Sequence, residues 1–294
     1  MGEKSILKYM LVIMYYILAQ PLLAQEESDS TEVNRHRLYL VIKNDDTEYI
    51  GTILKQDARE ILIKTERLGE IYIPKHEIRE IRELQPGDLN SEGQYIPKEV
   101  FATRYFLTTN GLPIEKGESY VLVSLYGPEI QFGVAEKVSL GVMTSWYGVP
   151  IIGTFKYSFS LGDKSSMAVG TLIGTGSWVA PDYGGILPFA ALTFGDRRSN
   201  ITFSGGYGAI FGGGVTEGNA LLSIAAMRKA GKRLSLIFDS FIAPTQFGTI
   251  AILFPGIRFQ SEAKKAFQFG FTGLIMDGTA IPLPIPMIQW FRKF

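Results

Sequence analysis

The sequence predicts an all-β protein: an antiparallel transmembrane β-barrel over residues 118–294, preceded by a small β-barrel domain over residues 36–84. Three observations support this fold class. Apolar and small polar side chains alternate in segments of about 8–12 residues. The connections between these segments are alternately short charged turns and longer uncharged loops. No long apolar helix follows Leu18. Together they indicate strands rather than helices as the elements that meet lipid.

The alternation is clearest at residues 266–274, A-F-Q-F-G-F-T-G-L. Successive side chains of a strand point to opposite faces, so the three phenylalanines share one face, and Gln268, Gly270 and Thr272 share the other. In a soluble sandwich the aromatic face would point into a core. In a membrane barrel it faces lipid, and the small polar face lines the lumen.

Composition excludes several kinds of chemistry. The 294 residues are 46% hydrophobic and 12% aromatic, enough for more than one domain. There is no cysteine, which excludes disulfides, thiolate metal sites and a cysteine nucleophile. The only histidines are His36 and His76, and two ligands make a poor zinc site. We therefore expect no catalytic residue, no cofactor and no metal.

The first 24 residues have the pattern of a secretory signal peptide. Lys4 and Lys8 precede an apolar run over residues 9–18, and Ala24 stands before the polar residues 25–30. The alternative, an anchor helix, is less favoured because the run is shorter than the ~20 residues of a membrane span. Residues 25–35 are expected to be a disordered start of the mature chain.

Residues 36–84 contain five short strands separated by turn residues. The segments are 37–42, 48–54, 60–64, 70–73 and 78–81. An Asp45-Asp46 turn follows the first segment, Gly51 lies within the second, and a turn at Asp57 precedes the third. This order resembles the Sm-like and SH3-like small β-barrels.

The resemblance implies RNA binding for Sm-like proteins, but the charge of this region opposes it. Residues 25–100 hold 17 acidic against 11 basic residues, a net charge of −6, whereas a nucleic-acid surface is basic. We expect no nucleic-acid partner, and instead a module that contacts a periplasmic protein or peptidoglycan. Residues 85–117 are interpreted as a turn-rich linker and a segment that leads the chain into the barrel.

The barrel region contains about twelve strand-like segments. They are 118–126, 129–135, 138–145, 151–161, 166–176, 186–194, 200–210, 219–228, 233–243, 249–260, 266–276 and 287–294. If Gly127-Pro128 marks the start of the barrel, the number falls to ten. The longer uncharged loops are predicted at 146–150, 179–185, 212–217, 244–246 and 278–286. Pro282, Pro284 and Pro286 place the last of these outside a strand ladder, because proline lacks an N–H donor.

Charged and amide residues in the middle of strands have apolar neighbours on both sides. Lys156 stands between Phe155 and Tyr157, and Arg258 between Ile257 and Phe259. A charge facing lipid at the midplane costs about 2–4 kcal/mol, so these side chains are expected to point inward. The predicted lumen-facing set is Glu129, Gln131, Lys156, Asp239, Arg258 and Gln268.

The chain ends in Phe294, with Trp290 and Phe291 just before it. A terminal aromatic residue that closes the last strand resembles Gram-negative outer-membrane β-barrel proteins, although Arg292 departs from that pattern. The resemblance implies a barrel in the cell outer membrane, in contact with its lipid, and an N-terminal domain in the periplasm.

These features leave three kinds of function to compare. The first is a structural or interaction protein whose lumen is filled by an ion-pair network. The alternative is a narrow channel for small polar solutes, in which the same residues form a constriction. An outer-membrane lipid-modifying enzyme is disfavoured because the barrel region has no histidine for a Ser–His pair, so we expect no enzymatic activity.

Overall fold

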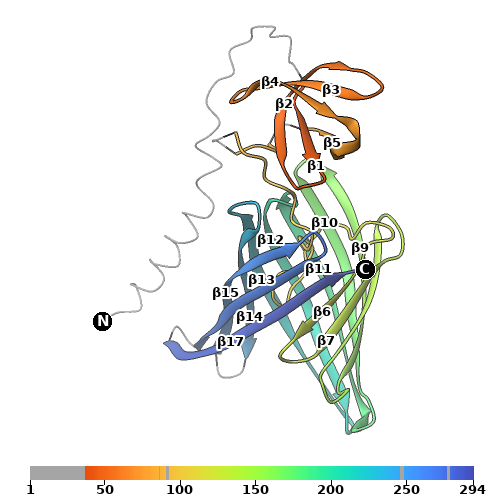
Figure 1. Ribbon diagram of the computed structural model, residues 1–294. Helices are drawn as coiled ribbons and strands as arrows, with labels where there is room; N and C mark the ends of the chain where they lie inside the picture. Colours follow the sequence, from red (N-terminus) through yellow and green to blue (C-terminus); the bar gives the residue numbers. More distant parts are fainter. Residues whose placement is uncertain (1–36, 86, 91–92, 246–247, 277–278) are drawn as a thin grey trace. The chain divides into compact units, whose positions relative to one another are not determined.

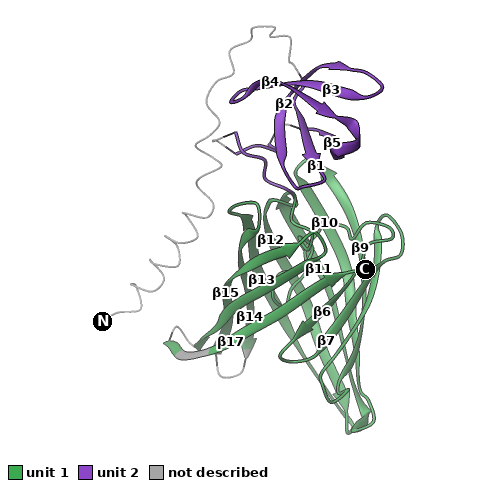
Figure 2. Ribbon diagram, in the orientation of Figure 1, with its two compact units in different colours: residues 1–17, 98–294 green, residues 18–97 purple. Residues whose placement is uncertain are grey.

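A computed structural model describes residues 37–85, 87–90, 93–245, 248–276 and 279–294. The predicted signal peptide and the predicted disordered start lie outside these residues. The chain divides into two compact units, one ending at Pro97 and the other beginning at Lys98 (Figures 1 and 2). Within the described part of the chain, no helix has the length and apolar character needed to cross a membrane.

The first unit contains a five-stranded antiparallel sheet, as predicted. Its strands are β1 (Tyr39–Lys43), β2 (Glu48–Gln56), β3 (Glu60–Thr65), β4 (Gly69–Pro74) and β5 (Ile78–Glu83). A 3-10 turn, η1 (Lys75–Glu77), precedes β5, and the strand order is β4-β3-β2-β1-β5. The described pairings leave β4 and β5 as two edges, so they give an open sheet and do not show the predicted closure into a small barrel.

Local chemistry explains the turns of this sheet. The Asp57 carboxylate accepts the N–H groups of Arg59 at 2.8 Å and Glu60 at 2.9 Å, which fixes the turn between β2 and β3. A Cβ on Gly51 would lie 2.1 Å from the Lys64 carbonyl oxygen, so the close approach of β2 and β3 requires glycine there. One face carries a small apolar core, which includes Ile61 and Ile63.

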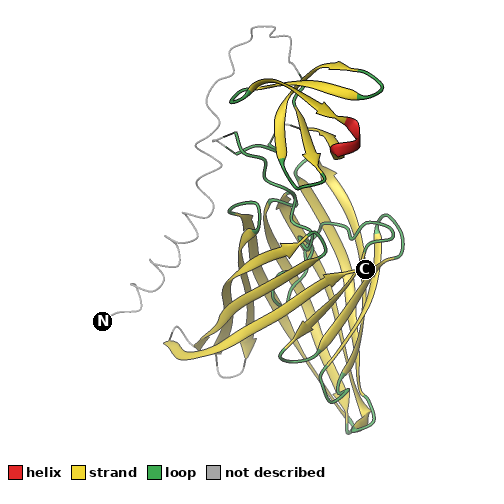
Figure 3. Ribbon diagram, viewed as in Figure 1, coloured by secondary structure: helices red, strands yellow, loops and turns green. Residues whose placement is uncertain are grey.

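The second unit is a closed barrel of twelve strands, all joined by antiparallel pairing, with strands forming nearly all of its regular structure (Figure 3). They are β6 (Ser119–Ser124), β7 (Pro128–Gly133), β8 (Val138–Thr144), β9 (Ile151–Gly162), β10 (Ser165–Gly176), β11 (Ala180–Gly195), β12 (Ser199–Gly212), β13 (Val215–Lys229), β14 (Leu234–Thr245), β15 (Gly248–Glu262), β16 (Lys265–Met276) and β17 (Thr279–Lys293). The barrel closes where β17 pairs with β6. This confirms the prediction of twelve strands over ten.

The side chains of β16 alternate between the two faces of the barrel wall, as the sequence predicts. Phe267 and Phe271 are 37% and 46% exposed, whereas Gln268 between them is 0% exposed. The same alternation runs through β9, where Lys156 is buried between the exposed Phe155 and Tyr157. The barrel therefore has an apolar outer surface and buries its polar side chains inside.

The prediction of longer loops at 179–185 and 212–217 is wrong. β11 already begins at Ala180, and only Gly213 and Gly214 separate β12 from β13. Both glycines have positive φ, 58° and 79°, which lets two residues connect paired strands. Uncharged, glycine-rich stretches can still form ladders, because strand pairing uses the main chain. The lysines and arginines of the turns at 137, 164, 197–198, 232–233 and 264 nevertheless all lie at one end, since each turn follows an odd-numbered strand of β7 to β15.

The prediction that Pro282, Pro284 and Pro286 lie in a loop is also wrong, because β17 contains all three. Alternate residues of a strand donate to the same neighbour. Phe294 donates its N–H to Ser119, at the start of β6, and Pro286 has the same parity. Among the described residues, β17 pairs with β6 only from Gln289 to Lys293, so Pro286 removes no ladder bond. Pro282 and Pro284 lie where the register between β16 and β17 shifts.

The N–H groups of alternate β17 residues point to opposite neighbouring strands, and position 286 faces a stretch without pairing. We therefore expect Pro286→Ala to leave the free energy of unfolding within about 0.5 kcal/mol of the original value. Ile285→Pro is expected to cost at least about 1–3 kcal/mol, because the N–H of Ile285 points to β16. Denaturant titration in micelles measures both, with Ile285→Ala as the control for the lost side chain. Equal effects of the two proline changes would contradict the assignment of donor sides.

Candidate functional site

The interior of the barrel is occupied by residues 99–114, here called the internal segment. Its residues Phe101, Ala102, Tyr105 and Phe106 are buried among side chains of the barrel wall. Near both of its ends it contacts Arg197: the Glu99 N–H donates to the Arg197 carbonyl at 2.9 Å, and Arg197 donates to the Pro113 carbonyl at 3.0 Å. The segment therefore enters and leaves at the end of the barrel that carries the charged turns.

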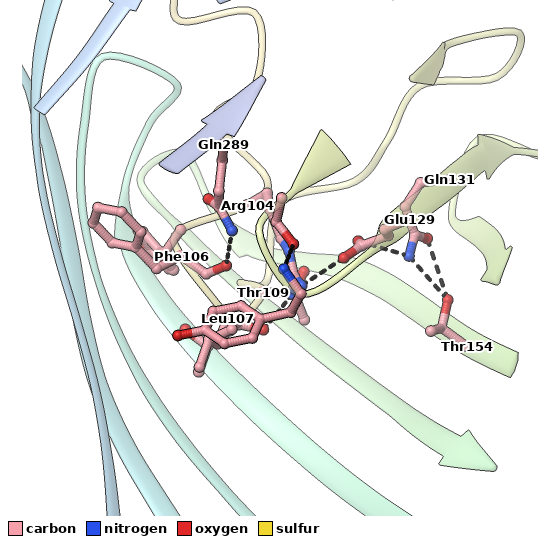
Figure 4. Close-up of polar contacts among 12 residues, drawn as sticks. Arg104, Phe106, Leu107, Thr109, Glu129, Gln131, Thr154 and Gln289 are labelled. Carbon is pink, nitrogen blue, oxygen red and sulfur yellow. Dashed lines mark hydrogen bonds and ion pairs between the residues drawn. The ribbon is translucent and has the colours of Figure 1, made fainter. Parts of the chain in front are cut away.

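Wall side chains accept or donate the hydrogen bonds that the internal segment cannot make within itself. Arg258 donates to the carbonyl of Phe101 at 2.6 Å and to the carbonyl of Arg104. Gln268 donates to the carbonyl of Tyr105 at 3.2 Å, and Gln289 to that of Phe106 at 2.8 Å (Figure 4). Because buried backbone groups must be paired, these three side chains replace a sheet or helix as the partner of the segment.

Asp239 on β14 accepts hydrogen bonds from the turn of the internal segment. Its carboxylate accepts the N–H groups of Phe106, Leu107 and Thr108 at 3.1, 2.7 and 2.9 Å, and the Thr108 hydroxyl at 2.6 Å. Each buried N–H that lost this acceptor would cost about 1–3 kcal/mol. This carboxylate therefore fixes the turn of the internal segment to the wall.

Glu99 joins the start of the internal segment to a buried charge cluster. Its carboxylate lies 3.2 Å from the Lys229 ammonium and 4.0 Å from the Arg258 guanidinium, and all three side chains are 0% exposed. Burial alone would raise the pKa of Glu99, but the charges of Arg258 and Lys229 outweigh it and hold the pKa below its usual value. The Glu99 carboxylate is ionised at neutral pH, and its contribution to stability is lost on acidification.

Phe106 packs against a flat part of the wall made by two glycines. A Cβ on Gly256 or on Gly270 would lie 2.5 Å from the Phe106 ring, and these two glycines are paired across β15 and β16. Phe254 flanks the ring with a centroid distance of 6.2 Å. A larger residue at either glycine would displace the aromatic ring that anchors the segment.

A second polar group lies beside the turn of the internal segment (Figure 4). Arg104 forms an ion pair with Glu129 at 2.6 Å, and Gln131 donates to Glu129 at 3.1 Å and to Thr154 at 3.1 Å. Lys156 donates to the carbonyls of Asn110 and Leu112 at 3.2 and 2.9 Å and to the Thr109 hydroxyl. Among the described residues, Lys156 has no ion-pair partner.

The structure places all six sequence-selected residues inside the barrel, buried. Five contact the internal segment directly, and Gln131 contacts it through Glu129. Sequence reasoning missed Glu99, Arg104, Lys229 and Gln289. Gln289 stands between Ile288 and Trp290, so the alternation that identified Gln268 could have found it. Glu99 and Arg104 lie outside any strand pattern, so nothing in the sequence marked them. His36 lies outside the described residues.

A cavity of about 260 Å³ remains inside the barrel next to the internal segment. Its polar lining includes Arg104, Glu129, Gln131 and Lys156. Most of the remaining wall is apolar, from side chains on β8, β10, β11, β13 and β14. These are Met143, Leu172, Leu187, Phe189, Leu221 and Phe241. A larger cavity of about 660 Å³ shares Leu172, Leu187 and Leu221 with it and reaches the end of the barrel opposite the charged turns.

The fold and the occupied interior define a closed twelve-stranded antiparallel β-barrel that contains a segment of its own chain. No family model matches the chain, and no curated protein matches it. Among solved structures, the outer membrane channel DcaP of Acinetobacter baumannii is similar, at 10% sequence identity and a TM-score of 0.33. The alignment covers 88% of this chain and 94% of that chain. A TM-score this low assigns neither family nor function.

The contacts of Asp239 predict that Asp239→Ala lowers the free energy of unfolding by at least about 3 kcal/mol, because three backbone N–H groups lose their acceptor at about 1–3 kcal/mol each. The chain has no cysteine, so Thr103→Cys provides a single thiol that reports release of the segment. Its labelling by a maleimide should be slow alone and faster when combined with Asp239→Ala. The exposed Asp163 serves as control, and equal effects of Asp163→Ala would contradict the anchoring role.

Proposed function

We propose that the protein is an outer-membrane channel whose lumen is held closed by the internal segment. The observation that carries this proposal is that residues 99–114, which belong to no barrel strand, occupy the lumen. An eight-stranded barrel is just wide enough to be filled by its own side chains, and diameter grows with strand number. Twelve strands therefore leave a lumen that the internal segment fills from one end.

The outer surface of the barrel supports a membrane location. Large apolar side chains are exposed on strands around the barrel, among them Leu140, Phe155, Val169, Ile186, Phe203, Leu236, Ile257, Phe267 and Trp290. The mid-strand charges Glu129, Lys156, Asp239 and Arg258 are buried inside. A soluble protein would gain nothing from this inverted arrangement, whereas lipid requires it. Outer-membrane lipid is the partner that would cover this surface.

The charged turns indicate an orientation in that membrane. In outer-membrane barrels with an even number of strands both ends of the barrel chain lie on the periplasmic side, and here both ends lie where the charged turns are. The charged end would then be periplasmic, and the five-stranded sheet would be a periplasmic domain. This sheet would be a small domain of the Sm-like or SH3-like kind.

A second candidate function is interaction with a periplasmic protein or peptidoglycan through residues 36–84. The observation that favours it is the pair of open sheet edges, with Leu68 beside β4 and Tyr72 on it exposed at 66% and 61%. Exposed edge strands are sites at which another chain can add a strand. Cross-linking in cells should give a specific adduct that is lost when residues 36–84 are deleted.

The membrane proposal predicts that the protein is recovered in the outer-membrane fraction and migrates differently on gel electrophoresis before and after heating. A closed barrel resists detergent until it is heated, because its strands pair without a free edge. Recovery as a soluble periplasmic protein, with no effect of heating, would show that the apolar outer surface has another role.

The closure proposal predicts low conductance of the intact protein in planar lipid bilayers. The double variant Asp239→Ala, Phe106→Ala should raise the open probability, because it removes both the carboxylate and the ring that anchor the internal segment. Arg258→Ala should act in the same direction. Lys137→Ala, in an exposed turn, is the matched control. A variant as silent as the original protein, although folded by the heat-shift assay, would contradict a channel.

A further inference from the structure

The 260 Å³ cavity beside the internal segment has a wall unlike that of a passage for polar solutes. Leu172, Leu187 and Leu221 project inward from three neighbouring parts of the wall, and Phe189 and Phe241 complete it. These positions have the inward parity of their strands, so they face the lumen and not lipid. Sites that bind small molecules are mostly apolar, with a few polar groups that fix orientation.

Polar atoms without a protein partner line this apolar cavity. The hydroxyls of Ser204 and Ser223, which are paired across β12 and β13, make no hydrogen bond with the described residues. The Nε of Arg104 also has none. Ser223 and Arg104 are only 5% and 8% exposed, and an unpaired buried polar group costs about 1–3 kcal/mol. These atoms are therefore available to a ligand.

The charges around the cavity favour an anionic ligand. Arg104 and Lys156 are the basic side chains of the lining and Glu129 is its acidic side chain, a formal net charge of +1. Glu129 already accepts from Arg104 and Gln131, whereas Lys156 binds only neutral oxygens in the described part of the chain. Glu217 lines only the outer, larger cavity and is exposed.

The outer cavity provides a route to this position. It continues from Leu172, Leu187 and Leu221 to glycine-rich parts of β10, β11, β12 and β13. Its lining there includes Gly174, Gly176, Gly184 and Gly208, which leave space along the wall. A chain-shaped molecule entering from that end would pass apolar surface before it meets the cations at the internal segment.

We propose that the cavity binds a single-chain amphiphile with an anionic head, a fatty carboxylate. The carboxylate lies at the inner end, where the Nε–H of Arg104 and the serine hydroxyls donate to it. Lys156 attracts it electrostatically, since its three N–H groups already bind Thr109, Asn110 and Leu112. The alkyl chain lies along the leucines and phenylalanines toward the outer cavity. This inference deepens the proposed function and rests on it, since it names the class of molecule that the channel would admit.

Equilibrium binding to the intact protein in lipid nanodiscs tests the proposal. The probe is 11-(dansylamino)undecanoic acid, whose fluorescence rises in an apolar site, with dodecanoate and dodecanol as competitors. Dodecanoate should displace the probe at a concentration at least about tenfold lower than dodecanol, a difference of about 1.4 kcal/mol. Equal displacement by the acid and the alcohol, or no saturable binding, would overturn the proposal.

Variants separate the head-group site from the apolar wall. Lys156→Gln should weaken dodecanoate about tenfold and leave dodecanol unchanged, whereas Lys137→Gln in an exposed turn should change neither. Leu187→Trp should weaken both competitors by filling the cavity, and it carries the test if Lys156→Gln does not fold. Unchanged binding in folded Leu187→Trp, or in folded Lys156→Gln, would overturn the assigned site.

The binding measurement and the conductance measurement test separate claims. Absent binding together with an active Asp239→Ala, Phe106→Ala channel would overturn the fatty carboxylate site and leave the channel in place. Selective carboxylate binding in a barrel that never conducts would support the site and contradict the channel.

Discussion

The width of a twelve-stranded barrel is the constraint on which the rest of this structure depends. Wall side chains alone do not fill such a lumen, so the chain fills it with residues 99–114. That segment has little regular structure, and its buried backbone groups need partners. The partners are Asp239, Arg258, Gln268 and Gln289, which explains why charged and amide side chains occupy the inner face of the strands.

The buried charged side chains are explained by the same need to hold residues 99–114 inside the barrel. Among the described residues, the interior holds four buried basic side chains, Arg104, Lys156, Lys229 and Arg258, and three buried acidic ones, Glu99, Glu129 and Asp239. A buried charge is costly unless it is paired or hydrogen-bonded. Glu99 and Glu129 form ion pairs, and Asp239 is held by N–H and hydroxyl donors. Lys156 is the cation that carbonyl and hydroxyl oxygens alone satisfy within the described residues, and it lies where the polar interior meets the apolar cavity.

The sequence predicted the wall of the barrel better than its contents. A period of two residues is a local signal, so all twelve strands and the inward direction of residues such as Lys156 and Gln268 follow from it. Residues 99–114 carry no such period, because their conformation is fixed by side chains more than a hundred positions away, as with Phe106 and Asp239. The prediction that Pro286 lies in a loop is wrong for a related reason. A proline breaks a strand ladder only where its missing N–H would have met a paired neighbour. For Pro286 that neighbour is β6, the first strand of the barrel, and β6 does not pair with β17 at this position.

Hydrogen exchange of the backbone amides tests the central claim, that the internal segment is bound inside the barrel, most directly. The N–H groups of Phe106, Leu107 and Thr108 donate to the Asp239 carboxylate inside the barrel. Peptides from residues 99–114 should therefore exchange as slowly as peptides from β16, because both open only when the barrel opens. Exchange of residues 99–114 within seconds, while β16 stays protected, would show that the lumen is not held closed by this segment.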